Sequence, residues 1–226
     1  MTNGEAGRAE QTQWHPSYAV VLVLLIGTLI LASIGGESPA GVLGALVLAS
    51  STLVAILWVS HTRRATLLVV CAVLAVGVLS SAFALFFLRD SSTAITVTGF
   101  AILAIAGAGP ILIGSDLFRQ GSVTIQTVLG AVNIYLLIGL FFAVLYSTVV
   151  VLSPAAPFTG MNAMRRVDLY YYSFIVLTTV GLGDFLPASD TVRVLTIIEA
   201  LLGQLYLVTV LALLVGKMGG RREPSG

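Results

Sequence analysis

Charged residues are scarce in this chain. Only 9% of its 226 residues are charged and 58% are hydrophobic, whereas a soluble globular domain carries about 25% charged residues. Eleven Lys and Arg against ten Asp and Glu leave a net charge of +1, which provides no basic surface for nucleic acid. The composition therefore excludes a soluble enzyme, a disordered chain and a nucleic-acid-binding protein, and it predicts a protein of the lipid bilayer.

The chain is also poor in residues that form cross-links or bind metals. Cys71 is the one cysteine, so no disulfide can form within the chain, and its apolar surroundings predict a buried thiol. His15 and His61 are isolated, whereas a metal site needs a cluster of ligands. The sequence has no phosphate-binding loop, nucleophile elbow or paired carboxylates, so we expect neither an enzyme nor a cofactor.

Long apolar runs are abundant. A helix needs about 20 apolar residues to cross the hydrocarbon core, and the runs predict an all-α membrane protein with six transmembrane helices. These spans are expected at residues 18–34, 41–59, 65–88, 94–114, 123–152 and 191–216. Between the fifth and sixth lies a shorter apolar segment at 168–180, a length typical of a re-entrant segment.

The fifth run is longer than a bilayer core, since about 30 residues extend roughly 45 Å at 1.5 Å per residue. Its polar start predicts an interfacial connector helix at 115–128 and a span at 129–152; one tilted helix is the alternative. The expected organisation is a cytoplasmic N-terminus at 1–17, four helices at 18–114, the connector, a second membrane unit at 129–216 and a cytoplasmic tail at 217–226.

Lys and Arg in the short loops set the orientation. With six spans, seven of them fall on the side of the termini and four on the other. This bias predicts a multi-pass protein of the cell membrane with both termini in the cytoplasm. The first run follows a segment with two acids and one Arg, which favours an uncleaved span over a signal peptide.

The most informative segment reads Thr-Thr-Val-Gly-Leu-Gly-Asp at 178–184. Gly181 and Gly183 allow backbone angles that other side chains forbid, so successive carbonyl oxygens can point one way and replace the water shell of a cation. Thr179 can add a hydroxyl oxygen, and Asp184 places a carboxylate at the outer end. The preceding short helix would direct its partially negative C-terminus toward the cation.

Residues 171–187 resemble the pore loop of potassium channels, whose filter reads TVGYG. The resemblance implies a filter formed by Thr179, Val180, Gly181, Leu182 and Gly183, with K⁺ bound as the permeant ion at the first four. It also implies an outer mouth at Asp184 and a gating hinge at Gly203, which follows Gly183 by 20 residues. Because the chain holds one copy of the motif and a ring needs four, we expect a homotetramer.

Other residues of the second membrane unit are expected to serve this pore. On the last helix, four residues recur at helical spacing: Gln204, Leu207, Leu211 and Val215. The resemblance implies that they line a cavity and inner gate, and packing against lipid or a neighbour is the alternative. Filter support is expected from Thr178, Tyr171, Tyr172 and Glu199. Glu199 would act in neutral form or pair with a tyrosine of the pore helix, and Asn133 is expected to bond across helices.

The fourth span contains no Lys or Arg, whereas a voltage sensor needs several, at about 2.3 kcal/mol per charge per 100 mV. We therefore expect passive conduction without conventional voltage gating, and a scaffold or a site for another stimulus in the first four spans. A separate regulatory partner stays an open alternative.

Leu182 replaces the usual aromatic residue of the filter, so a weakly selective cation channel is one alternative function. A non-conducting channel-like subunit is another.

Overall fold

The computed structural model describes residues 18–34, 39–59, 103, 106–114, 124–153, 155–159 and 165–219. Within these ranges the chain is helical and contains no strand; Phe158 and Pro187 form an isolated bridge. The helices are α1 (Tyr18–Ile34), α2 (Pro39–Val59), a helical stretch at 106–114, α5 (Ile125–Leu152), α6 (Arg166–Leu177) and α7 (Asp190–Gly219). The all-α class expected from the sequence therefore holds for the described residues.

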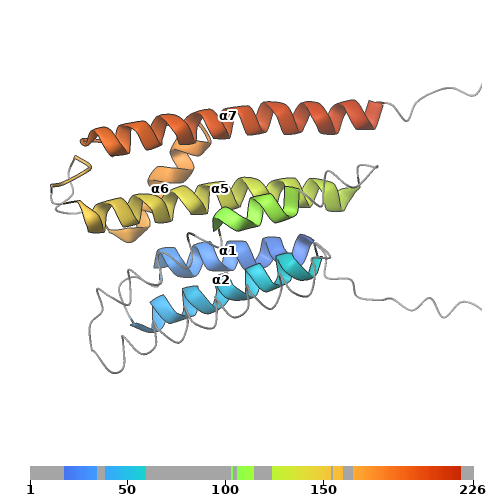
Figure 1. Ribbon diagram of the computed structural model, residues 1–226, viewed down its shortest axis with the longest axis horizontal. Coiled ribbons are helices and arrows are strands. Elements are labelled where there is room, and N and C mark those ends of the chain that lie inside the picture. Colours follow the sequence, from blue (N-terminus) through green and yellow to red (C-terminus); the bar gives the residue numbers. More distant parts are fainter. Residues whose placement is uncertain are drawn as a thin grey trace, which may run out of the picture.

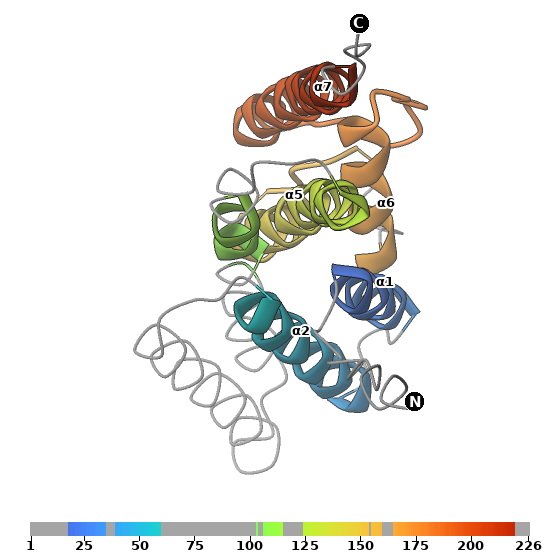
Figure 2. The same ribbon diagram turned by 90° about the vertical axis from the view of Figure 1, so that its right-hand side faces the viewer.

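Four long helices lie side by side along the longest axis, in the order α7, α5, α1 and α2 (Figure 1). The short helix α6 crosses them obliquely and extends along the side of α5 from α7 to α1 (Figure 2). The stretch at 106–114 packs on α5 and α2, because Gly107 adjoins Phe141 and Gly109 adjoins both Leu137 and Ile56. Helices α5, α6 and α7 contact one another, and the segment at 178–184 lies in the connection from α6 to α7. We refer to these three helices and their loops as the unit.

Local sequence explains where these helices begin. Pro39 starts α2, a position where proline's missing N–H costs nothing. The Thr124 hydroxyl accepts the backbone N–H of Thr127 and caps α5, so α5 begins at Ile125. It continues without a break through residue 129, where the span proper was expected to begin. Ser189 accepts the N–H of Val192 at the start of α7.

Two of the described helices are long and apolar enough to cross a membrane, α5 and the portion Asp190–Val210 of α7. Shorter apolar helices occupy Tyr18–Ser33 and Val47–Val59. The expected third span at 65–88, most of the fourth at 94–114 and the first part of the connector, 115–123, lie outside the described residues. Residues 125–128, expected in that connector, belong to α5.

Two hydrophobic clusters hold the helices together. The first joins α1, α2, the stretch at 106–114 and α5, and includes Val21, Leu25, Leu53, Ile56, Ile113, Leu137 and Leu140. The second joins α5, α6, the start of α7 and the connecting loop, and includes Phe142, Tyr146, Phe158, Leu169, Tyr172, Val176 and Val192. The buried Asn133 of α5 donates from Nδ2 to the Tyr18 carbonyl at 2.9 Å, which confirms the expected bond across helices.

Candidate functional site

The short helix α6 ends where the glycine-containing segment begins. The Ile175 carbonyl accepts the N–H of Val180 at 2.9 Å and that of Gly181 at 3.1 Å. The Thr178 hydroxyl donates to the Phe174 carbonyl at 2.6 Å. The carbonyls of the last turn of a helix have no partner within the helix. Here the segment itself supplies hydrogen-bond donors to them, and these bonds hold the segment against the end of α6.

The backbone of this segment alternates in the sign of φ. Thr179, Gly181 and Gly183 have φ of 59°, 54° and 77°, and no other described residue has a positive φ. The positive φ of the two glycines agrees with the backbone freedom expected for glycine. Nothing in the sequence predicted the left-handed φ of Thr179. Such a conformation in a residue with a branched side chain stores local strain, which is common at functional sites.

All residues from 178 to 184 are exposed in the single chain. Val180 and Leu182 leave 59% and 64% of their surface uncovered. A Cβ added at either glycine of the segment would meet nothing within 4 Å. The segment therefore lies open on one side of the unit.

The last carbonyl of α6 is held from two sides. The Tyr135 hydroxyl of α5 donates to the Leu177 carbonyl at 3.0 Å, and the Tyr135 ring stacks on Tyr206 of α7 at 5.8 Å. Gly203 of α7 is buried directly behind the same carbonyl, since a Cβ there would come within 2.3 Å of the oxygen. Helices α5 and α7 together fix the point at which the exposed segment starts.

Glu199 is fully buried one turn before Gly203. Its Oε2 accepts the Tyr146 hydroxyl of α5 at 2.7 Å, and its Oε1 lies within hydrogen-bond distance of Ser173 Oγ on α6. The sequence-based pairing with a tyrosine of the pore helix is therefore wrong: the tyrosine partner lies on α5, and the partner on α6 is a serine. Tyr172 instead shares a 2.7 Å hydrogen bond with Thr196.

Aromatic rings of α5, α6 and the loop between them pack together. Tyr146, Phe158 and Tyr172 pack edge to face with centroids 4.9–5.9 Å apart. Tyr171 faces the other way and contacts Phe185 at 6.2 Å. The two neighbouring tyrosines thus have separate surroundings, Tyr172 in the core and Tyr171 beside Phe185.

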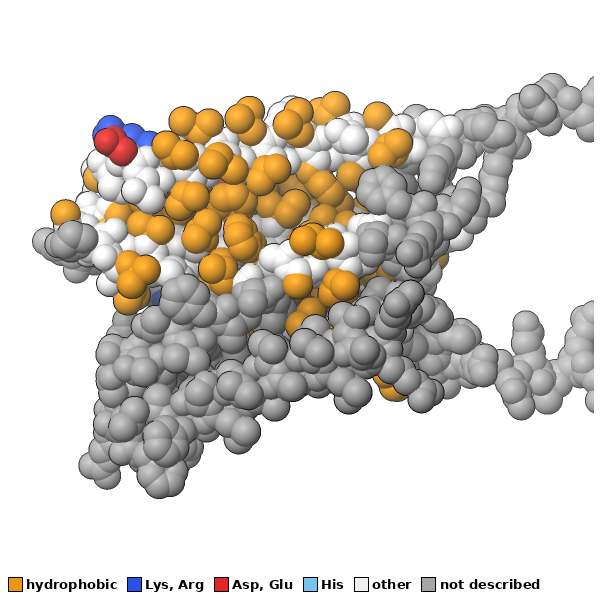
Figure 3. Space-filling model, viewed as in Figure 1, with side chains coloured by type: hydrophobic (Ala, Val, Ile, Leu, Met, Phe, Trp, Pro, Cys, Tyr) orange, Lys and Arg blue, Asp and Glu red, His pale blue; other side chains and the backbone are white. Residues whose placement is uncertain are grey.

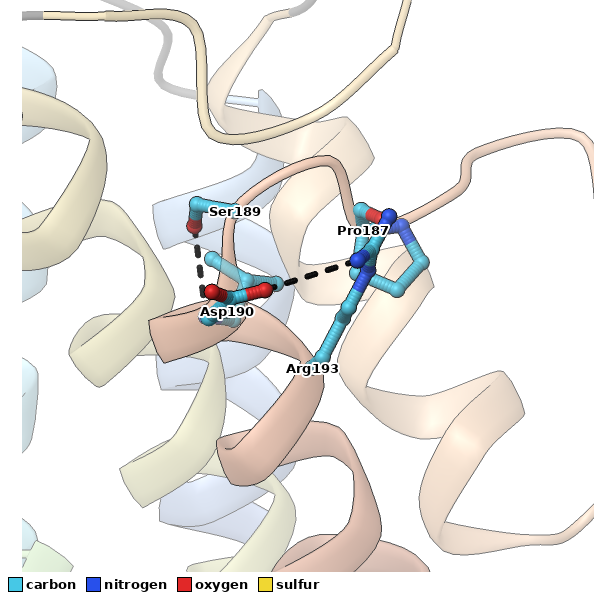
Figure 4. A network of polar contacts seen from close by, with 5 residues as sticks. Pro187, Ser189, Asp190 and Arg193 are labelled. Atoms are coloured by element: carbon cyan, nitrogen blue, oxygen red, sulfur yellow. Dashed lines mark hydrogen bonds and ion pairs between the residues drawn. The ribbon is translucent and has the colours of Figure 1, made fainter.

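The loop after the segment is tied to α7. Arg193 Nε donates to the Pro187 carbonyl at 3.3 Å, and its Nη1 lies 3.4 Å from Asp190 Oδ1 (Figure 4). The N–H groups of Ala188 and Ser189 donate to the Pro157 carbonyl at 2.8 and 3.2 Å. These bonds join the loops before α6 and after the segment at one end of the unit.

One surface of the unit is apolar. On the face drawn in Figure 3, hydrophobic side chains cover α5 and α7, and charged side chains gather at one end. Exposed apolar residues of α7 include Val194, Ile197, Ile198, Leu201, Leu202, Leu205 and Val208. Gln204 and Leu207, expected at the cavity, are exposed too. Leu211 and Val215 belong to α7, and their side chains lie outside the described part.

The sequence pointed to the segment at 178–184 and to Glu199, but not to the side chains that bond to Glu199 and to the start of the segment. Tyr135, Tyr146 and Ser173 donate hydroxyl hydrogen bonds at the junction of α5, α6 and α7. One signal was available: Tyr135, Gly139 and Tyr146 recur at helical spacing on α5 and so share one face. Within the described residues, no three His, Cys, Asp or Glu side chains lie together in a way that could hold a metal ion.

The unit formed by α5, α6 and α7 is similar in sequence to known proteins. Residues 131–219 match the model of a family described as "Ion channel", and this stretch contains nearly all of α5, and the whole of α6, the exposed segment and α7. Over 50 residues, 22% of the chain, it is 36% identical to "Two-pore potassium channel 4" of Arabidopsis thaliana. That match spans 18% of the plant protein. No solved structure matches significantly. The family match supports an ion channel and argues against an enzyme.

Proposed function

We propose that the chain is one subunit of a homotetrameric, potassium-selective channel of the cell membrane, which conducts passively and is not conventionally voltage gated. The observation that carries the proposal is the alternating φ of residues 179–183. A backbone that alternates between left- and right-handed φ turns its N–H groups to one side and leaves its carbonyls to the other. The ion channel match and the plant potassium channel relative support the same function.

In this proposal, K⁺ is the permeant ion and no cofactor takes part. Carbonyl oxygens of Thr179, Val180, Gly181 and Leu182 replace its water shell, and Gly183 completes the filter. Asp184 concentrates cations at the outer mouth, and the partial negative charge at the end of α6 favours a cation at the inner end. The hydrogen bond from Tyr135 that holds the Leu177 carbonyl supports this assignment, because a filter needs fixed oxygens.

The exposure of the segment supports a tetramer. In a membrane, backbone that is not helical must be buried in protein or line water, and one chain leaves residues 178–184 uncovered. Four copies around an axis would cover Val180 and Leu182 with neighbouring chains and leave the carbonyls facing the axis. The exposed apolar side chains of α7 supply surface for contact with neighbours and lipid.

The remaining parts of the proposal rest on the charge bias of the loops and on the resemblance of the pore sequence. Both termini lie in the cytoplasm, and the loop near Asp190 faces outside. The last helix bends at Gly203 when the channel opens, and four residues of α7 line the cavity and gate: Gln204, Leu207, Leu211 and Val215. Thr178, Tyr171, Tyr172 and Glu199 support the filter from behind.

An ion flux assay tests the function. The purified protein is reconstituted in liposomes loaded with K⁺ or Na⁺, and the release of each ion is measured. We expect K⁺ release that exceeds Na⁺ release and is blocked by Ba²⁺, an ion of similar size to K⁺. Absence of flux of either ion under every tested voltage and pH would favour a non-conducting subunit.

Gly181→Ala tests the assignment of the filter. At φ 54° an L-residue costs about 1–2 kcal/mol, and a tetramer pays this four times, so we expect K⁺ flux to be abolished. Space is not the obstacle, because a Cβ at Gly181 meets nothing within 4 Å. Gly114→Ala is the control, since a Cβ there also meets nothing and its φ is not positive. Normal K⁺ flux in Gly181→Ala would remove the filter from this segment.

A weakly selective cation channel is the second candidate, and Leu182 favours it. Leucine has no hydroxyl with which to tether the filter to the surrounding helix, and 64% of its surface is uncovered in the single chain. Comparable K⁺ and Na⁺ fluxes in the same liposomes would establish this function in place of potassium selectivity.

A further inference from the structure

Glu199 lies at the junction of α5, α6 and α7 with no exposed surface. The two ion pairs among the described residues join Arg165 with Asp168 and Arg193 with Asp190, so neither involves it. Its electrostatic neighbours in that part of the chain are the tyrosine hydroxyls of residues 135, 146 and 172. A buried carboxylate without a cation is strongly disfavoured, because two hydroxyl contacts replace only part of the water it has lost.

The hydrogen atoms available at this junction decide the protonation state. Ser173 Oγ lies 2.8 Å from the Gly139 carbonyl and also within hydrogen-bond distance of Glu199 Oε1. A serine hydroxyl carries one hydrogen, and a backbone carbonyl can only accept. If Glu199 were ionised, Ser173 could satisfy one of these two acceptors, and the other contact would bring two oxygens together with no hydrogen between them.

A protonated Glu199 satisfies every contact. Its Oε1 donates to Ser173, Ser173 donates to the Gly139 carbonyl, and Oε2 accepts the Tyr146 hydroxyl at 2.7 Å. The result is a directed chain of hydrogen bonds that begins and ends on α5 and passes through α7 and α6. We propose that Glu199 is a neutral carboxylic acid, and that its hydrogen bond to Ser173 fixes the position of α7 against α6.

The hydrogen bond between Glu199 and Ser173 lies next to the contact between Gly203 and Leu177. Ser173 and Leu177 are four residues apart on α6, and their partners Glu199 and Gly203 are four residues apart on α7. The two contacts are therefore adjacent layers of one interface. A slip at the Glu199 layer would move Gly203 away from the carbonyl at which the filter segment begins. Only this last step rests on the proposed channel function.

Infrared spectroscopy tests the protonation state. The spectrum of the reconstituted protein at neutral pH is compared with that of Glu199→Gln, which removes the carboxyl group and keeps its shape. We expect the difference spectrum to contain the carbonyl band of a protonated carboxylic acid. The control Asp190→Asn removes an exposed carboxyl group, and its difference spectrum should contain no carbonyl band of a protonated carboxylic acid. A Glu199→Gln difference spectrum with carboxylate bands and no protonated carbonyl band would overturn the proposal.

Two further variants test the direction of the bond and its role in positioning. Ser173→Ala removes the acceptor, so the protonated band of Glu199 should shift to higher frequency while remaining present. Glu199→Ala should lower the thermal midpoint by about 4–8 °C, and Glu199→Gln should restore it, because an amide can donate to Ser173 and accept from Tyr146. Equal loss of stability in the Gln and Ala variants would refute the neutral donor. These readouts require no conduction, so they remain decisive even if the flux assay fails.

Discussion

Gly203 offers a sharp test, because two roles for it predict opposite effects of Gly203→Ala. As a hinge alone, the position would gain helix propensity from alanine, worth about 1 kcal/mol per residue. As a packing glycine, it would lose stability. In the structure its added Cβ would lie 2.3 Å from the Leu177 oxygen and 3.1 Å from the Leu177 carbonyl carbon. Both are backbone atoms and cannot rotate away.

The size of the effect follows from that distance. Ordinary van der Waals contact begins at 3.4 Å, so α7 would have to retreat from α6 by about 1 Å. Overpacking costs about 1–3 kcal/mol, and a clash with backbone belongs at the upper end. After the gain in helix propensity, we expect a net loss of about 2 kcal/mol. That loss corresponds to a thermal midpoint lower by roughly 4–8 °C for a chain of this size.

The assay is thermal unfolding of the purified protein, followed by far-ultraviolet circular dichroism. Gly216→Ala is the matched control: it lies on the same helix, and an added Cβ there meets nothing within 4 Å. We expect its midpoint to stay equal or rise. A midpoint of Gly203→Ala that rises as much as that of Gly216→Ala would refute the packing argument and leave the hinge as the sole role of this glycine.

Other contacts give smaller expected effects in the same assay. Tyr135→Phe removes the hydroxyl that holds the Leu177 carbonyl and should lower the midpoint by about 2–4 °C; an unchanged midpoint would mean that the bond contributes nothing. Arg193→Gln breaks an exposed ion pair with Asp190 and should change stability by less than about 1 kcal/mol, so a large loss would contradict its surface character. Asn133→Ala removes the bond to the α1 backbone and should cost about 1–2 kcal/mol, most visibly as easier proteolysis of α1.

How much of the fold was predictable depends on the signal that each element carries. Apolar length marked α1, α2, α5 and α7, because the hydrocarbon core sets a minimum length that is read directly from sequence. The short helix α6 was also expected, and it starts two residues before the predicted 168. The sequence left open whether a connector and a span or one helix occupy residues 115–152. The start of α5 at Ile125 depends on Thr124, which caps the helix through a hydroxyl whose partner depends on local geometry.

By itself, the sequence determined the membrane class, the location of the filter-like segment and the need for glycine at 181 and 183. Those properties depend on composition and on backbone freedom, which are local. Only the tertiary structure decided that Thr179 also adopts a left-handed φ, that Glu199 meets Tyr146 and Ser173, and that Gly203 lies against Leu177. The contacts of Glu199 and Gly203 join residues 26–53 positions apart on three helices, and their partners depend on how the helices cross.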